Sequence, residues 1–229
     1  MGEVVRDGDT VIRPAGEWTP AVHGLLRHLT DAGVRSVPVL IAADDCHEVL
    51  SFVPGTVPTY PMPEWVWAEA SLESAGRLLR RVHDATAGVP IEGPWRSPVR
   101  EPVEVICHND FAPYNLVFDR QAVVGVIDWD YASPGPRPWD VAYLAYRIVP
   151  LSSGDRLDGF TDDERSLRLE RLIAAYGSDF APCEVLAVLH DRLLALADFS
   201  EEASERLGKP ELAEHARLYR YDAARVSAT

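Results

Sequence analysis

The sequence predicts an α+β fold with two lobes, a small β-rich lobe at the N-terminus and a larger, mainly helical lobe after it. Short β-prone runs fill the first part of the chain, amphipathic stretches fill most of the rest, and a proline-rich stretch at residues 56–63 separates them. We therefore expect one lobe over residues 1–55 and the other over 56–229. A chain of 229 residues is long enough for two such lobes to bury a sizeable core.

The N-terminal lobe is expected to hold two antiparallel strand pairs. Asp7-Gly8 lies between the β-prone runs 3–6 and 10–13, and Asp-Gly in such a position is a strong hairpin signal. A second pair, residues 37–42 and 48–53, is joined by a polar turn. Together the four strands would form a small sheet.

Helices are predicted where apolar residues recur at the helical period. The first helix would have Thr19 as its N-cap and Pro20 at its first position, and Gly33 would end it in the left-handed conformation. A longer helix carries an apolar stripe from Leu72 and ends near Thr86. Three more helices are expected in the last third of the chain, at residues 164–176, 182–199 and 210–226.

Composition restricts the classes of partner. Hydrophobic residues make up 47% and charged residues 25%, which is typical of a soluble globular protein, and no apolar run approaches the ~20 residues that cross a bilayer. A net charge of −14 argues against a nucleic-acid partner. The same charge could attract a cationic substrate, or it could serve solubility alone. Three widely spaced cysteines favour neither a disulfide framework nor a metal motif, and a reducing cytoplasm is the expected location.

A polar loop between two apolar runs is the strongest functional signal. His108, Asn109 and Asp110 directly follow the apolar residues 105–107, and Asn115 precedes a second apolar run. Polar side chains in such a setting must be hydrogen-bonded or used in function.

The strands that follow this loop bring its polar groups to one place. Residues 116–118 and 122–127 are β-prone and joined by a short turn, and antiparallel pairing across it sets Asn115 beside Asp128. Asp110 returns to the same end of the hairpin through the loop. Three oxygen-bearing side chains would then form a site for a hard cation that also holds substrate phosphates. Asn115 and Asp128 could instead be turn formers that satisfy their own backbone.

The spacing of His108, Asp110 and Asn115 resembles the kinase catalytic loop H-x-D-x-x-x-x-N, and Asp128-Trp129-Asp130 stands where D-F-G would. With asparagine after the histidine, and with the later stretch IDWDYASPGPRPWDVAYLAY, the chain is similar to the aminoglycoside phosphotransferase and choline kinase family. The stretches LLRRVHDAT and VLSFVPG resemble that family's helix before the loop and its interlobe hinge. The resemblance covers most of the chain. It implies a protein kinase-like fold and an ATP-dependent phosphotransferase.

The resemblance also implies a role for each matching residue. Asp110 would accept or orient the proton of an acceptor hydroxyl, while Asn115 and Asp128 would hold Mg²⁺ on the phosphates of ATP or GTP. Nucleotide contacts are implied for the strand cation, the hinge backbone and the apolar floor of the adenine pocket, namely Arg13, Ser51, Val53, Val117 and Ile127. His108 and Asp140 would support the loop. From the residues alone, Asp140 is expected simply to cap the helix that starts at Val141.

The acceptor is less defined. Aminoglycoside-, choline- or sugar-like alcohols fit the resemblance, and acidic residues near the site could bind an amine on such a molecule: Asp130, Asp198, Glu201 and Glu202. An exposed, solvated helix face is the alternative interpretation of the acidic residues after Asp198.

Three features of an active kinase are weak in the front lobe. No glycine-rich loop precedes the first hairpin, Arg13 replaces the expected strand lysine, and the first predicted helix offers no acidic partner before Asp31. Two alternatives to a kinase therefore stay open: a kinase-like module that has lost catalysis but binds a nucleotide or metabolite, and an unrelated metal-dependent hydrolase.

Overall fold

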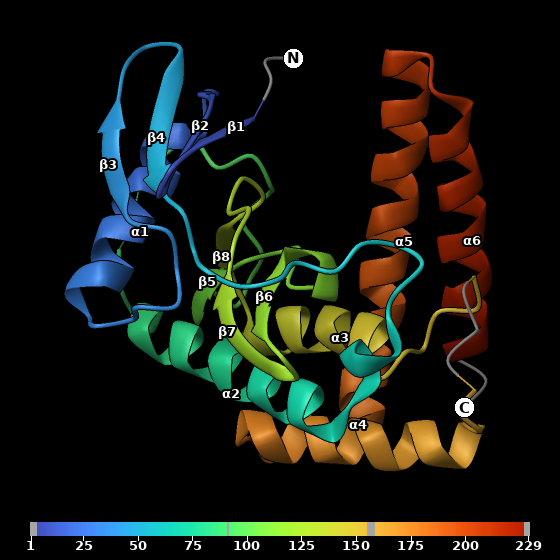
Figure 1. Cartoon of the computed structure of the whole chain (residues 1–229). Helices are drawn as coiled ribbons and strands as arrows, with labels where there is room; N and C mark the ends of the chain where they lie inside the picture. The colour runs from blue at the N-terminus through green and yellow to red at the C-terminus, as the bar shows by residue number, and fades with distance from the viewer. Residues whose placement is uncertain (1–3, 91, 155–158, 227–229) are drawn as a thin grey trace.

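The computed structural model of the chain describes residues 4–90, 92–154 and 159–226. It has an α+β fold with two lobes, in which a small antiparallel sheet and one helix lie at one end of a larger, mainly helical part (Figure 1). The predicted fold class is confirmed.

The N-terminal sheet has four antiparallel strands in the order β1-β2-β4-β3. They are β1 (Val5–Asp7), β2 (Thr10–Pro14), β3 (Leu40–Ala43) and β4 (His47–Ser51). The first hairpin turns at Gly8, whose φ of 57° is the left-handed conformation that glycine adopts without strain. Both predicted strand pairs form, and Glu3 lies outside the described residues.

One helix, α1 (Thr19–Asp31), packs its apolar side chains into the core. The prediction that Thr19 caps it is wrong, because Thr19 is already helical and Trp18 occupies the cap position. The Thr19 hydroxyl instead accepts a hydrogen bond of 2.7 Å from the amide of Gly16. Gly33 follows the helix with a φ of 80°, as predicted.

In the described part of the larger lobe there are five α-helices (Figure 1): α2 (Glu69–Thr86), α3 (Arg137–Ile148), α4 (Asp162–Tyr176), α5 (Pro182–Leu207) and α6 (Pro210–Val226). Short 3-10 turns lie at Glu64–Trp67 and Pro113–Asn115. Helix α5 continues past its predicted end at residue 199 and stops before Gly208, which has a φ of 64°. Helices α5 and α6 form an antiparallel pair at one side of the lobe.

Two short strand pairs carry the polar loop. β5 (Val105–Cys107) pairs with β8 (Ser133–Gly135), a pairing that the sequence did not predict, and β6 (Leu116–Asp119) pairs with β7 (Ala122–Val126). Leu116 lies opposite Val126, and the amide of Ile127 donates to the carbonyl of Asn115 over 2.9 Å. The register therefore sets Asn115 next to the residue that precedes Asp128.

The segment after β4 crosses the β6–β7 hairpin and joins the lobes. Thr56 and Phe118 exchange two backbone hydrogen bonds of 2.8 Å. Gly55 passes so close to the hairpin that a Cβ there would lie 2.6 Å from a Val117 methyl and 2.7 Å from the Phe118 carbonyl. This close approach requires glycine. Among the described helices, none combines the length and the apolar character that a membrane crossing requires.

Candidate active site

Asp110 lies in the loop between β5 and β6, with both carboxylate oxygens held by neighbours. Oδ1 accepts a hydrogen bond of 2.7 Å from the Tyr114 hydroxyl, and Oδ2 accepts one of 2.8 Å from Nδ2 of Asn115. Burial raises the pKa of Asp110 above its usual value, and the hydrogen bonds and nearby cations offset only part of that increase. The carboxylate is therefore fixed in orientation and is more basic than an exposed aspartate.

His108 lies fully buried beneath Asp110 and uses both ring nitrogens within the loop. Nε2 donates to the carbonyl of Ile127 over 3.0 Å, and Nδ1 accepts the amide of Asp110 over 3.2 Å. Its ring packs against Trp129 with centroids 4.6 Å apart. This placement ties the loop to the end of the hairpin and leaves neither nitrogen for proton transfer.

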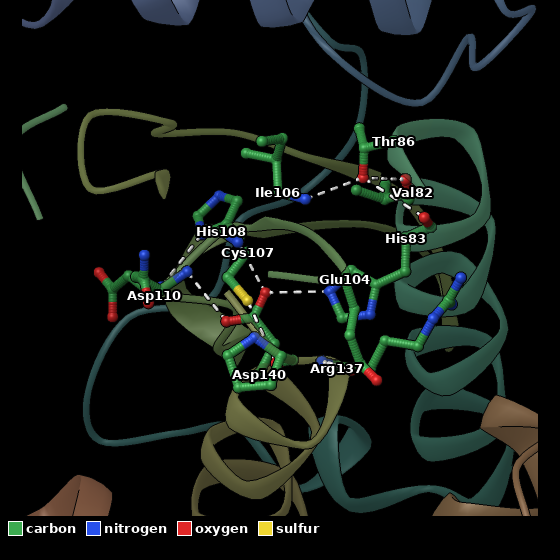
Figure 2. Close-up of polar contacts among 12 residues, drawn as sticks. Val82, His83, Thr86, Glu104, Ile106, Cys107, His108, Asp110, Arg137 and Asp140 are labelled. Carbon is green, nitrogen blue, oxygen red and sulfur yellow. Dashed lines mark hydrogen bonds and ion pairs between the residues drawn. The ribbon is translucent and has the colours of Figure 1, made fainter. Parts of the chain in front are cut away.

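Asp140 anchors the loop from the first turn of α3 (Figure 2). Its Oδ2 accepts the amide of His108 over 2.6 Å, and Oδ1 accepts the amide of Asn109 over 2.9 Å. Burial raises the pKa of Asp140, but the hydrogen bond with His83 and the attraction of His83, Arg192 and His108 together outweigh burial and hold the pKa below the usual value. The interpretation of Asp140 as a cap of its own helix is wrong, since its carboxylate is used on the loop.

A buried cluster beside the loop has the residue types of a metal site but the bonding of a structural network. The ligand atoms of His83, Cys107 and Asp140 lie within 4.8 Å of one another (Figure 2). Burial raises the pKa of the Cys107 thiol well above its usual value, so it is protonated and donates to the Pro136 carbonyl. His83 contacts Tyr176 through Nδ1 and Asp140 through Nε2. The geometry and protonation favour hydrogen bonding over metal coordination.

Asn115 and Asp128 have the chemistry of hard-cation ligands. Nδ2 of Asn115 also donates to the Asp110 carbonyl over 3.0 Å, so its amide nitrogen faces Asp110 and its oxygen faces away. Asp128 has a φ of 63°, unusual for a residue other than glycine, and its side chain is 49% exposed. An amide oxygen and an accessible carboxylate fit Mg²⁺, which prefers one or two protein oxygens together with phosphate oxygens.

The charges of this region act on the phenol of Tyr131. Burial raises the pKa of Tyr131, Arg96 lowers it, and Asp110, Asp128 and Asp130 raise it further. The three carboxylates therefore act on one phenol. Asp130 itself is paired with Arg96 at 3.6 Å.

Arg13 extends from β2 across to the larger lobe. Its Nη2 lies 2.6 Å from Oδ1 of Asp130, and its Nη1 lies 3.4 Å from Oδ1 of Asp128. Burial lowers the pKa of Arg13, but Asp130, Glu48 and Asp128 together raise it above its usual value. The strand cation is thus in contact with the expected metal ligand Asp128.

Glu48 is a site residue that the sequence did not reveal. It lies opposite Arg13 on β4, and its Oε1 is 2.5 Å from Arg13 Nε. Its Oε2 is 2.5 Å from Nε2 of His23 on α1. The acidic partner of the strand cation therefore comes from the sheet rather than from the helix. The sequence offered one hint, a carboxylate within a predicted strand. The structure shows that this side chain is only 1% exposed.

Of the expected nucleotide contacts, Val53 and Val117 come together at Gly125, where a Cβ would lie 2.6 Å from a Val53 methyl and 3.5 Å from Val117 Cβ. Val117 is 1% exposed, and Ile127 is half-buried. The amide of Ser51 donates to the Val39 carbonyl over 2.8 Å, so this N–H belongs to the sheet and is not a free donor.

A cavity of about 600 Å³ opens beside Asp110, bounded by the loop and by helices α5 and α6. Asp198 and Glu202 are in its wall, whereas Glu201 is not. Asp198 and Glu201 both pair with Arg220 of α6, at 3.2 and 2.5 Å. Two of the acidic residues expected to meet an amine thus already have a cationic partner.

Comparisons with known proteins identify the family and the fold. The model of the phosphotransferase enzyme family matches residues 94–186, which include the loop, the hairpin and α3. The trifolitoxin immunity protein of Rhizobium leguminosarum bv. trifolii is 31% identical over 222 residues, which cover 91% of this chain and 82% of that protein.

Solved structures share the fold. A choline/ethanolamine kinase family protein from Mesorhizobium loti superposes with a TM-score of 0.69 at 17% identity, covering 99% of this chain and 85% of that one. Ethanolamine kinase from Plasmodium vivax superposes with a TM-score of 0.69 at 12% identity, covering 94% of this chain and 75% of that one. A spectinomycin phosphotransferase, solved with ADP and spectinomycin, superposes with a TM-score of 0.64 at 11% identity, covering 96% of this chain and 86% of that one.

Proposed function

The chain belongs to the phosphotransferase enzyme family, and from this premise we propose that it transfers the γ-phosphoryl group of ATP, with Mg²⁺, to a hydroxyl of a small molecule. The observation that carries the proposal is Asp110, which lies in the wall of a cavity of about 600 Å³, oriented by Tyr114 and Asn115. A cytoplasmic location, where ATP is available, is part of the proposal.

Asp110 would act on the acceptor hydroxyl. Its buried carboxylate, with a raised pKa, takes or orients the proton as the oxygen attacks phosphorus, a contribution typically about 10²–10⁴-fold. Asp140 holds the amides of His108 and Asn109, so the loop keeps this carboxylate in place without further reorganisation.

Asn115 and Asp128 would hold Mg²⁺, which supplies charge neutralisation on the phosphates when it is bound. Arg13 lies close enough to Asp128 to contact the same phosphates. Val53, Val117 and Ile127 would contact the adenine. The amide of Ser51 is hydrogen-bonded within the sheet, so only the carbonyl of Ser51 could contact the adenine.

A binding module without catalysis is the second candidate. Arg13 forms ion pairs with Asp128 and Asp130. The first hairpin turns at a single glycine, Gly8, where an active kinase would have a glycine-rich loop. The protein would then bind a nucleotide or metabolite without transferring phosphate. The third hypothesis, an unrelated hydrolase, has no support in a chain of this family.

The test is incubation with Mg²⁺-ATP and a broad panel of hydroxyl compounds, with ADP as the readout. Acceptor-dependent ADP release that Asp110→Asn abolishes supports the kinase. Binding of Mg²⁺-ATP without turnover on any compound would move the assignment to the binding module.

The immunity protein among the relatives suggests a protective role, in which the acceptor is a toxic compound. A sensitive strain that expresses the wild type should survive a challenge with trifolitoxin. The same strain with Asp110→Asn should not survive if protection is catalytic, and should survive if protection is by binding.

A further inference from the structure

The wall of the cavity beside Asp110 carries two arginines that form no direct ion pair with a carboxylate of the described residues. Arg192 of α5 is 3% exposed, and Arg100 precedes β5. In the part of the chain that the structure describes, neither guanidinium forms an ion pair with a carboxylate, and the nearby Asp130 and Asp198 pair with other arginines. Arg192 is attracted by Asp110 and Asp140 at longer range and donates to the Asn109 carbonyl, while Arg100 is half-buried, so an anion in the cavity would add a direct partner for both cations.

Two buried N–H groups in the same wall have no hydrogen-bond partner among the residues that the structure describes. They are Nε of Arg192 and Nε1 of Trp139, and both residues line the cavity. An unpaired buried donor is costly, and native proteins rarely keep one without a reason. Both unpaired groups are donors that solvent does not reach, so they add positive potential to this wall without offering a contact at the cavity surface.

The indole of Trp139 brings these groups together. The guanidinium carbon of Arg100 lies 4.0 Å from its ring centroid, and that of Arg192 lies 4.9 Å away. Burial lowers the pKa of Arg100, and the positive charge of Arg192 lowers it further. Two cations that repel each other across one ring would both be stabilised by an anion.

We propose that the phosphoryl acceptor carries an anionic group, a carboxylate or a phosphate, that binds at Arg100, Arg192 and Trp139. This inference rests on the proposed kinase function and names the substrate class of its acceptor site. Nη2 of Arg192 donates to the carbonyl of Asn109, the residue before Asp110. An anion held by Arg192 therefore fixes the acceptor next to the carboxylate that acts on its hydroxyl.

A cationic acceptor fits this wall poorly. Its amines would lie near two unpaired guanidinium groups, while Asp198 is already paired with Arg220 and Glu202 is exposed to solvent. The net charge of −14 belongs to the whole surface and does not describe this cavity. The expectation of an amine-bearing acceptor is replaced by an anionic one.

The test measures binding by calorimetry in the presence of Mg²⁺-ADP. The probes are malate and 3-phosphoglycerate, which combine a hydroxyl with anionic groups, together with the uncharged diamide of malate and the polycationic kanamycin. We expect at least one anion to bind about tenfold or more tightly than the diamide. A single hydrogen bond to a charged group typically strengthens binding by about that factor. The ranking of the two anions distinguishes a carboxylate site from a phosphate site.

Variants localise the effect. Arg100→Gln should weaken anion binding about tenfold, and Arg100→Lys should restore part of it. Arg192→Gln would also remove the hydrogen bond to the Asn109 carbonyl of the loop. The side chain of Arg100 has no such bond to the loop, so Arg100→Gln tests anion binding more directly. Arg206→Gln removes an exposed charge from the same helix as Arg192 and should change nothing. Thermal melts check that each variant is folded.

The outcomes separate this inference from the proposed function. Anions that bind no better than the diamide, or kanamycin that binds more tightly and is insensitive to Arg100→Gln, would overturn the anionic site. Phosphorylation of kanamycin alone would overturn it as well and leave the kinase assignment intact. Anion binding that depends on Arg100, without turnover on any acceptor, would support the site and argue against the kinase.

Discussion

Glu48→Gln removes a buried negative charge that joins β2 to α1 through Arg13 and His23. The Glu48 carboxylate is 1% exposed and lies 2.5 Å from both Arg13 Nε and His23 Nε2. Removing one partner of a buried ion pair costs about 3–5 kcal/mol. Arg13 keeps Asp128 and Asp130 as counter-charges, so we expect the lower end of that range, about 3 kcal/mol of unfolding free energy.

Urea and thermal unfolding measure this loss. In a chain of this size, 1 kcal/mol shifts Tm by about 2–4 °C, so Glu48→Gln should melt about 6–12 °C below the wild type. The control is Glu73→Gln, whose exposed pair with Arg77 at 3.2 Å on α2 contributes about 0.3–0.5 kcal/mol. A loss below about 1 kcal/mol in Glu48→Gln would refute the buried pair as a stabilising link between sheet and helix.

Three further predictions concern the loop and the strand cation. Tyr114→Phe removes a donor that lowers the pKa of Asp110, so the acid limb of the kcat–pH profile should move to higher pH; an unmoved limb contradicts the contact. Asp140→Asn removes the charge that accepts two loop amides, and we expect kcat to fall about tenfold or more with little change in KM for ATP. A rise in KM for ATP as large as the fall in kcat would refute a loop-positioning role. Arg13→Ala should weaken Mg²⁺-ATP binding in calorimetry; unchanged affinity would mean that Arg13 is only a lobe-joining ion pair.

The loop and its hairpin were predictable because local spacing determines them. Asp110 and Asn115 are five residues apart, and the two β-prone runs that follow have one plausible register, which brings Asp128 to the same end. The short turn sets the pairing of Asp119 with Ala122, and a one-residue irregularity between Val117 and Phe118 shifts the register of the pairs nearer Asn115. The fold class follows from the same kind of local evidence.

Pairings between distant segments were beyond sequence reasoning. Glu48 opposes Arg13 only because β4 pairs with β2 in one particular register, 35 residues away. Asp140 occupies the first turn of a helix, where aspartate is common for local reasons, so its bonds to the loop could not be told from capping. These contacts appear only when the chain is folded.

The cavity wall shows the same limit. Arg100, Trp139 and Arg192 come from three separate segments, and no motif joins them. The acidic residues of α5 were visible as a run, but their partner Arg220 comes from α6, which pairs with α5 after a turn at Gly208. The sequence therefore predicted the sign of the surface charge and not the charge of the pocket.

A calorimetric titration of Mg²⁺-ATP into the wild type, Asp110→Asn and Asp128→Asn tests the central assignment most directly, because it needs no knowledge of the acceptor. If Asp110 acts on the acceptor hydroxyl and Asp128 holds the metal, Asp110→Asn should bind Mg²⁺-ATP as the wild type does and Asp128→Asn should bind it more weakly. Equal affinities in Asp128→Asn and the wild type, or an Asp110→Asn variant that loses as much affinity as Asp128→Asn, would contradict the account.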